Sequence, residues 1–287
     1  MRRIWYTRTM LFKRIAAFAA LAIAASACGS QTTQTQSTAS KAGTPGSIVI
    51  SGSTALLPLV KQAAVDYQNA HPGSKISVAG GGSRVGVTQV AQRAVDIGDS
   101  DIPAPDQPAL VDHRVAVVTF AVIVNPQAGV KNLTTAQLRS VFSGAVTNWS
   151  AVGGRAGQIT VINRPRSSGT RAVLVQKLLG GKEPTESGLT QDSSGTVAEM
   201  VAQTPGAISY VGTAYVKPGA VTMVSVDGVA PAASNVIGNT YKYWSFEHMF
   251  TNGQPSAQVA AFIDYVKNDA ALLRTLKFIP VGSVKGS

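Results

Sequence analysis

The 287-residue chain has few of the residues on which catalytic and metal-binding chemistry depends. It contains one cysteine and three histidines, and charged residues make up 14% of it. A single cysteine excludes both a disulfide framework within the chain and a thiolate metal site. None of His71, His113 and His248 lies in a glycine-rich turn where it could serve a serine nucleophile, and no His, Asp and Glu cluster has metal-ligand spacing. We therefore expect no enzyme, no metal and no cofactor.

The excess of positive charge does not by itself indicate a nucleic-acid partner. The formal net charge is +11, from 25 basic and 14 acidic residues. Five of the basic residues precede the apolar run at positions 15 to 27: Arg2, Arg3, Arg8, Lys13 and Arg14. Without these five, 20 basic residues face 14 acidic ones, a net charge of +6, and they are scattered along the chain. Because no basic run could follow a phosphate backbone, we expect no nucleic-acid partner.

The first 28 residues have the pattern of an export signal. A basic start is followed by an apolar stretch that is too short to span a membrane, which takes about 20 residues. Small residues at 25 to 27 then precede Cys28, and this arrangement resembles the lipobox of bacterial lipoproteins, although Ala25 stands where that motif usually has leucine. The resemblance implies a lipid anchor at Cys28 on the extracytoplasmic face of the cell membrane. The alternative is a plain secretory signal with an incidental cysteine.

Residues 29–46 are mostly Gln, Ser, Thr, Ala and Gly, and their composition predicts a disordered tether.

Beyond the tether, strands and helices alternate. An apolar strand at 47–50 enters Ser51-Gly52-Ser53-Thr54, and a helix-spaced apolar pattern from Leu56 to Tyr67 follows. A second strand at 75–79 opens into glycines and a helix at 87–94. The glycine spacing does not match a dinucleotide-binding loop, and no suitable acidic residue follows. A third strand near residue 97 ends in an acidic turn that contains Asp101.

The second half of the chain predicts another lobe and a return to the first. The apolar run Val115 to Val124 is typical of a strand that crosses between lobes. Capping boxes at 134–137 and 196–199 predict helix starts, and Ser256 precedes a helix at 259–266. The alternation predicts an α/β fold with two lobes. We place the first lobe at 47–120, the second at 121–241 and the return to the first at 242–287.

The segment Val161 to Ala172 carries the clearest functional signal. A buried strand at 159–162 breaks into Arg164-Pro165-Arg166-Ser167-Ser168-Gly169-Thr170 before an amphipathic segment at 172–179. Ser167 or Ser168 can cap the helix, and the helix N-terminus favours negative charge. Together with the fork of Arg164, these groups predict a cradle for a tetrahedral oxyanion. The alternative is an ordinary helix cap beside a surface arginine.

Five phrases, in this order and spacing, extend the pattern: Ser51 to Ala55, Gly82-Ser83, Asp96 to Asp101, Leu133 to Trp149 and Arg164 to Arg171. They resemble the phosphate-binding proteins of bacterial phosphate ABC importers, over about residues 48 to 267. The resemblance implies a two-lobed, periplasmic-binding-protein-like type II fold that closes on inorganic phosphate and delivers it to a membrane permease, as a monomer. The implied ligand-binding residues are Thr54, Ala55, Ser83 and Asp101 from the first lobe, and Arg164, Ser168, Gly169 and Thr170 from the second. Arg84, Arg166 and Ser167 depart from the family pattern, and we expect both arginines to face solvent.

Asp101 suggests which oxyanion the site would take. A carboxylate repels an anion unless that anion has a proton to donate, and at neutral pH phosphate keeps one whereas sulfate does not. The alternatives are a structural Asp101 that caps the turn before Pro103, a site for sulfate or molybdate, and a surface phosphate sensor or adhesin without a role in transport.

Overall fold

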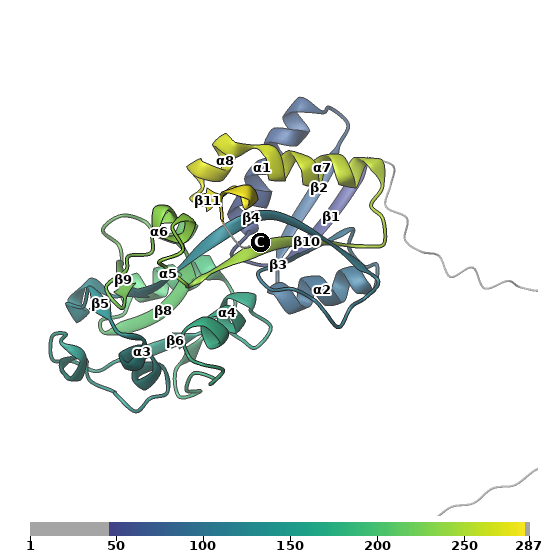
Figure 1. Cartoon of the computed structure of the whole chain (residues 1–287). Helices are drawn as coiled ribbons and strands as arrows, with labels where there is room; N and C mark the ends of the chain where they lie inside the picture. Colours follow the sequence, from purple (N-terminus) through teal and green to yellow (C-terminus); the bar gives the residue numbers. More distant parts are fainter. Residues whose placement is uncertain (1–45, 285–287) are drawn as a thin grey trace, which may run out of the picture. The chain divides into compact units, whose positions relative to one another are not determined.

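The computed structural model describes residues 46–284, so the predicted signal peptide, Cys28 and all but the last residue of the tether predicted at 29–46 lie outside the described residues. In the first lobe, β1 (Ser47–Gly52) lies between β2 (Lys75–Gly80) and β3 (Ile97–Ser100) and is parallel to both. The connecting helices, α1 (Leu57–Ala70) and α2 (Ser83–Ala91), lie on opposite faces of these strands, as right-handed crossovers require (Figure 1).

Two long antiparallel strands connect the lobes. β4 (Leu110–Val124) pairs with β10 (Trp244–Asn252) from Leu110 to Thr119, and then with β8 (Ala207–Gly212) from Phe120 to Val124. β10 also pairs with β3, so the strand order is β2-β1-β3-β10-β4-β8-β6-β7. Residues 115–124 are buried throughout, which explains why the sequence shows a continuous apolar run there rather than an alternating pattern.

The second lobe surrounds the far half of β4. Its strands are β5 (Asn132–Leu133), β6 (Thr160–Asn163), β7 (Leu189–Thr190), β8 and β9 (Thr222–Val226). Its helices are α3 (Thr135–Phe142), α4 (Gly169–Lys177), α5 (Ser194–Gln203) and α6 (Ala233–Ile237), with short 3-10 turns at Pro126–Ala128 (η1), Trp149–Val152 (η2) and Thr213–Tyr215 (η3). β8 and β9 both pair antiparallel with β4, which ties this lobe to the crossing strand.

The chain then returns to the first lobe. α7 (Ala257–Asn268) and α8 (Ala270–Thr275) lead into β11 (Phe278–Ile279), which pairs with β4, and a 3-10 turn at Val281–Ser283 (η4) follows. α7 lies beside α1, and Tyr67 makes edge-on ring contacts with Phe262 and Tyr265 (Figure 1). This packing returns the end of the described chain to the lobe in which it began.

The two-lobed α/β prediction is confirmed, and the local signals at two helix starts are confirmed with it. Thr134 and Gln137 form both bonds of a capping box, and Ser256 caps α7 by accepting from the Val259 N–H. The capping box predicted at 196–199 is wrong, because α5 begins two residues earlier, at Ser194. The predicted lobe boundaries, near residues 120 and 241, stay predictions.

Two other helices begin earlier than their apolar patterns predict. α2 starts at Ser83 instead of residue 87, and α4 starts at Gly169, directly after the predicted cap Ser168 and three residues ahead of its apolar pattern. A Cβ on Gly86 would lie 2.7 Å from both the Asp99 and the Ser51 carbonyl oxygens, so the first turn of α2 packs directly on the backbone of β1 and β3. Tertiary contact therefore extends these helices into polar sequence that shows no amphipathic signal.

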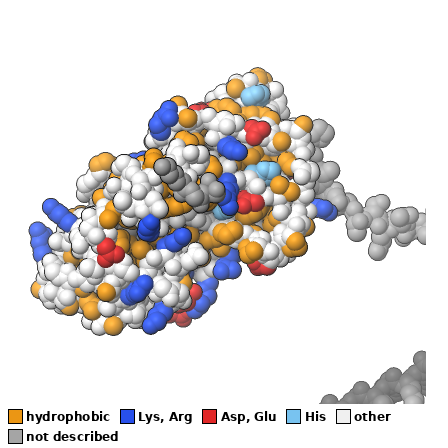
Figure 2. Space-filling view, viewed as in Figure 1, with side chains coloured by type: hydrophobic (Ala, Val, Ile, Leu, Met, Phe, Trp, Pro, Cys, Tyr) orange, Lys and Arg blue, Asp and Glu red, His pale blue; other side chains and the backbone are white. Residues whose placement is uncertain are grey.

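On the face in Figure 2, lysine and arginine side chains are spread over both lobes with acidic residues among them. Within residues 46–284, no helix has both the length and the apolar character that crossing a membrane requires.

Candidate functional site

Polar side chains from both lobes meet where strands end and helices begin. Ser53 and Thr54 follow β1, Asp101 follows β3, and Arg164 follows β6. Ser83, Gly169 and Ser194 are the first residues of α2, α4 and α5. Arg164 and Asp101 are each only 1% exposed, so both charges of this polar cluster are out of water. A buried charge is tolerated only where hydrogen bonds or an opposite charge compensate for lost hydration.

Asp101 accepts hydrogen bonds from both lobes. The hydroxyl of Ser53 donates to one carboxylate oxygen, and Thr170 Oγ1 donates to the other at 2.7 Å. The backbone N–H of Asp101 donates to Ser83 Oγ at 2.9 Å. The turn before Pro103 is capped by Ser100, whose Oγ accepts from the Ile102 N–H at 3.1 Å. The alternative role for Asp101, as the cap of that turn, is therefore wrong.

Arg164 is held by the backbone on one side and by hydroxyls on the other. Its Nε donates to the Gln191 carbonyl at 3.0 Å and its Nη2 to the Asp192 carbonyl at 2.6 Å. The guanidinium also reaches Thr54 Oγ1 at 2.8 Å and Ser194 Oγ at 3.0 Å. Burial lowers the pKa of Arg164 and the charge of Asp101 opposes that shift, but an arginine stays protonated in proteins. The carbonyl bonds therefore fix the direction of a permanent positive charge.

A second arginine supports the loop that carries the first. Arg171 Nη1 donates to the Arg164 carbonyl at 2.7 Å, and its Nε and Nη2 both lie 2.8 Å from Glu183. Ser168 caps α4, since its Oγ accepts from the Arg171 N–H at 3.3 Å. The cap leaves the first-turn N–H groups at Gly169 and Thr170 without intrahelical partners, as at any helix N-terminus. The strand, turn and helix start predicted here are confirmed.

Ala55, another residue predicted to bind the ligand, lies just before the start of α1. Its N–H donates to Ser53 Oγ at 3.0 Å, and the Leu56 N–H donates to the same oxygen at 3.1 Å. Ser53 thus accepts two backbone bonds while it donates to Asp101. An anion that takes the Ala55 N–H must displace the Ser53 oxygen.

The two lobes are in direct contact at the site. A Cβ on Gly169 would overlap Ser83 Oγ and lie 2.9 Å from the Asp101 Cβ. The Arg84 N–H donates to the Ser167 carbonyl at 3.1 Å, and the Tyr215 hydroxyl donates to the Thr54 carbonyl at 2.6 Å. These contacts bring all eight predicted residues into one closed, buried network, whereas their contact with a ligand stays a prediction.

The two arginines that depart from the family pattern lie outside this network. The Arg166 side chain is 67% exposed and pairs with Glu186 at 2.7 Å and with Glu183 at 3.6 Å. Arg84 is also exposed. The prediction that both face solvent is confirmed.

Sequence reasoning assigned no role to two hydroxyl-bearing residues of the site, Ser194 and Tyr215. Ser194 is fully buried and bonds both Arg164 and Thr54. A signal for Ser194 was present, since Ser194-Gly195-Thr196 repeats the triplet Ser168-Gly169-Thr170 at a second helix start. Tyr215 follows β8 and had no comparable motif.

The histidines are bound elsewhere in the described structure. His71 lies 3.0 Å from the Tyr67 carbonyl, His113 lies 3.0 Å from Thr251, and His248 lies 2.8 Å from Asp112. Among residues 46–284, no group of three or more His, Cys, Asp or Glu side chains is arranged to hold a metal ion.

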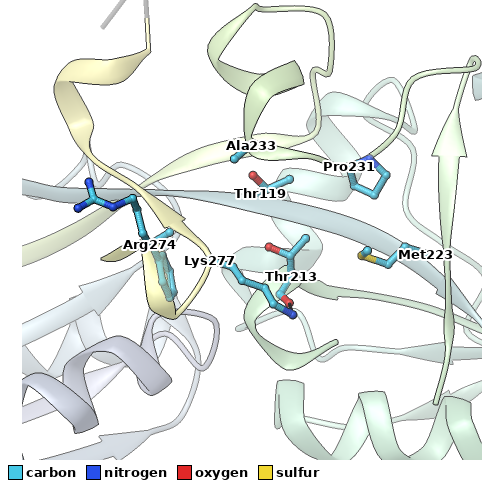
Figure 3. A pocket seen from close by; sticks show the side chains of 8 residues that line it. Thr119, Thr213, Met223, Pro231, Ala233, Arg274 and Lys277 are labelled. Atoms are coloured by element: carbon cyan, nitrogen blue, oxygen red, sulfur yellow. Dashed lines mark hydrogen bonds between the residues drawn. The ribbon is translucent and has the colours of Figure 1, made fainter. Parts of the chain in front are cut away.

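A separate pocket of about 310 Å³ lies beside the crossing strand β4 (Figure 3). It is lined by Thr119, Thr213, Met223, Pro231, Ala233, Arg274, Lys277 and Phe278. Lys277 Nζ donates to the Val216 and Thr213 carbonyls at 2.8 and 3.3 Å, and in Figure 3 the Arg274 guanidinium points away from the other labelled side chains. Its cations therefore do not converge, as recognition of an oxyanion requires.

A closed polar site between two α/β lobes joined by crossing strands defines a solute-binding protein. Residues 31–270 match the family model of the PBP superfamily domain. The chain is 44% identical to the phosphate-binding protein PstS of Bacillus subtilis over 248 residues, which cover 84% of this chain and 82% of that protein. The chain therefore belongs to the PBP superfamily and, within it, to the family of PstS phosphate-binding proteins.

Solved structures agree with this assignment. A Clostridium perfringens protein with bound phosphate, described as the substrate-binding protein of a phosphate ABC transporter, superimposes with a TM-score of 0.78 at 27% identity, covering 82% of this chain and 99% of that one. An ABC-type phosphate transport receptor from Vibrio cholerae gives a TM-score of 0.67 at 26% identity, covering 81% and 99%.

Proposed function

We propose that this chain is an extracytoplasmic lipoprotein that binds inorganic phosphate and delivers it to the permease of an ABC importer. One observation carries the proposal: the guanidinium of Arg164 and the carboxylate of Asp101 are both buried in one cluster, and both bond to hydroxyl groups there. A hydrolytic role has no support, since the histidines are engaged elsewhere. One chain supplies every group of the proposed site, so we propose that the protein acts as a monomer.

Phosphate would take over bonds that the site groups now make with one another. The Nη atoms of Arg164 would turn from Thr54 and Ser194 to two phosphate oxygens, a bidentate pairing that suits a guanidinium. The freed hydroxyls, with Ser83 and the N–H groups at Gly169 and Thr170, are donors for the remaining oxygens. Because an oxyanion taken from water needs all its oxygens satisfied, many neutral donors and a single cation suit it.

Asp101 would supply selectivity. It is the one group of the proposed site that must accept a hydrogen bond from the ligand. Phosphate has a proton to donate at neutral pH and sulfate does not, so the carboxylate favours phosphate.

A calorimetric binding titration with phosphate, sulfate and molybdate tests the ligand. We expect tight binding of phosphate, together with a rise in thermal stability that grows with phosphate concentration, and little response to sulfate at equal ionic strength. A preference for sulfate or molybdate would replace this proposal with the other oxyanion alternative.

Anchoring and delivery need tests in cells. Cys28→Ser should release the protein from the membrane fraction or leave it unprocessed, and unchanged fractionation would refute the lipid anchor. Deletion of the gene should lower phosphate uptake. Normal uptake in a strain whose protein still binds phosphate would favour the sensor or adhesin alternative.

A further inference from the structure

Three carboxyl groups lie together behind the proposed ligand site. Asp99, Asp101 and Glu247 are each at most 1% exposed. Ser100 pairs with His248 in the antiparallel ladder between β3 and β10, so Asp101 and Glu247 come next to each other at the end of that ladder. The register of β10 against β4 shifts between Glu247 and His248, and such bulges redirect side chains. The fold thus brings a third acid from a distant strand against Asp101.

The hydrogen bonds to Asp101, and their absence at Asp99 and Glu247, indicate which of these acids carries a proton. Both oxygens of Asp101 accept from hydroxyls, those of Ser53 and Thr170, and such bonds stabilise an ionised carboxylate. Within residues 46–284, no N–H or hydroxyl group donates to the Glu247 oxygens or to those of Asp99. Glu247 is fully buried, its oxygens have no hydrogen-bond partner in the described structure, and Asp101 is its neighbour at the end of the ladder. A carboxyl group buried in this way is tolerated as the neutral acid, whose proton then has the Asp101 carboxylate as an acceptor within the cluster. The proton belongs on Glu247, because only Asp101 has donors to stabilise its charge.

The electrostatic surroundings agree with this placement. Burial, then the charge of Asp101, then that of Asp99 raise the pKa of Glu247 well above its ordinary value. Burial and the charge of Asp101 likewise raise the pKa of Asp99. From η3, Tyr215 also interacts with Glu247, and burial raises the pKa of that phenol, so it is neutral. On β4, the residue opposite Glu247 is Ala116, which carries no charge.

We propose that Glu247 is a positioning residue whose carboxylic acid donates a hydrogen bond to Asp101 and thereby keeps Asp101 an acceptor toward the ligand. The inference rests on the proposed function, since it assigns how the same site selects a protonated oxyanion. With Glu247 and Asp99 neutral, a single carboxylate faces the single guanidinium of Arg164. An ionised Glu247 would push a proton onto Asp101, which would then donate to the ligand and accommodate sulfate.

Two substitutions at Glu247 distinguish a hydrogen-bonding role from a packing role. Glu247→Gln keeps an N–H donor and stays neutral at every pH, whereas Glu247→Leu fills similar space without a donor. We expect Leu to weaken phosphate binding by roughly ten- to a hundredfold, the value of a hydrogen bond to a charged group, and Gln to bind within about threefold of wild type. A site that needs only filled volume would tolerate Leu as well as Gln, and that result would overturn the proposal.

The pH profile provides a readout that a structural role would not move. As the pH rises through the raised pKa of Glu247, the wild type should lose phosphate affinity and should take up protons on binding, because the ligand's charge raises that pKa further. Calorimetry in buffers of different ionisation enthalpy measures this uptake. Glu247→Gln should abolish both effects, and Glu199→Gln, on the exposed surface of α5, should retain them. Identical profiles in the wild type and Glu247→Gln would overturn the proposal.

Difference infrared spectroscopy tests the proton without relying on ligand binding or on the folding of the Gln variant. At pH 8, the ligand-free wild type should show the carbonyl band of protonated carboxylic acids, and Asp99→Asn should leave one such band. Absence of that band would mean that Glu247 is ionised, which refutes this inference. A wild type that shows the band but binds no phosphate would refute the proposed function instead.

Discussion

The two charges of the site are held in opposite ways. Arg164 is fixed by the carbonyls of Gln191 and Asp192, which are parts of the backbone and cannot rotate away. Asp101 is held by hydroxyl groups, from Ser53 and Thr170, that can turn to other partners. The difference assigns separate tasks. We expect the rigid guanidinium to supply most of the affinity for the ligand, and the carboxylate, whose donors can exchange, to supply the selectivity.

The most damaging single change should be Arg164→Ala. It removes the buried cation that we propose pairs with the ligand, and it leaves the anion's oxygens and two carbonyls without their donor. We expect phosphate binding to weaken by about 2 to 5 kcal/mol, much of it from groups left poorly paired. Isothermal titration calorimetry measures the loss. A mild effect would mean that the Arg164 guanidinium does not hold the ligand.

Asp101→Asn should alter selectivity more than affinity. Two unit charges about 4 Å apart at an effective dielectric near 20 interact by about 4 kcal/mol, which is roughly a thousandfold in binding. The amide can turn its NH2 toward an unprotonated oxygen, so the variant should narrow the gap between phosphate and sulfate. Competition between the two anions measures that gap. If the wild type already accepts sulfate as readily as phosphate, the carboxylate does not face the ligand.

Gly169→Ala tests whether phosphate binding requires the close contact between the two lobes at Gly169 and Ser83. The added methyl group would lie 2.8 Å from the Ser83 Cβ, so the lobes would have to part or shift. Overpacking of this kind costs about 1 to 3 kcal/mol, and we expect it to appear as weaker phosphate binding. Gly282→Ala is the matched control, because nothing lies within 4 Å of its added methyl group. Equal affinities in the two variants would show that binding does not require this contact.

The smallest effect is expected at Arg166. This side chain is exposed and paired with Glu186, so Arg166→Ala should change phosphate affinity by no more than about threefold. It is also the control for Arg164→Ala, since each removes one guanidinium from the same loop. A large loss at Arg166 would reverse our assignment of the two arginines.

Local sequence signals predicted much of the secondary structure and part of the site. They did not predict which residues come together where distant strands pair. The strand, turn and helix start around Arg164, the α3 capping box and the Ser256 cap depend on neighbours in sequence, and all were predicted. The starts of α2 and α5 were placed four and two residues late, because these helices begin in polar sequence that shows no apolar periodicity. Glu247 had no motif at all. Its place beside Asp101 follows from the pairing of β10 with β3, which no local pattern specifies.

The strand that joins the lobes has a mechanical consequence. β4 is paired with β10 or β8 from Leu110 to Val124, apart from the register shift at Val115, without a loop between the lobes. Hydrogen bonds fix the register of two paired strands, whereas the twist between them varies, most of all in two-stranded ribbons. We therefore expect the lobes to part and return mainly by a rotation that twists this ribbon. The stiffness of the ribbon would then set the rate at which the site opens, and we expect substitutions in β4 away from the site to change how fast a bound solute is released.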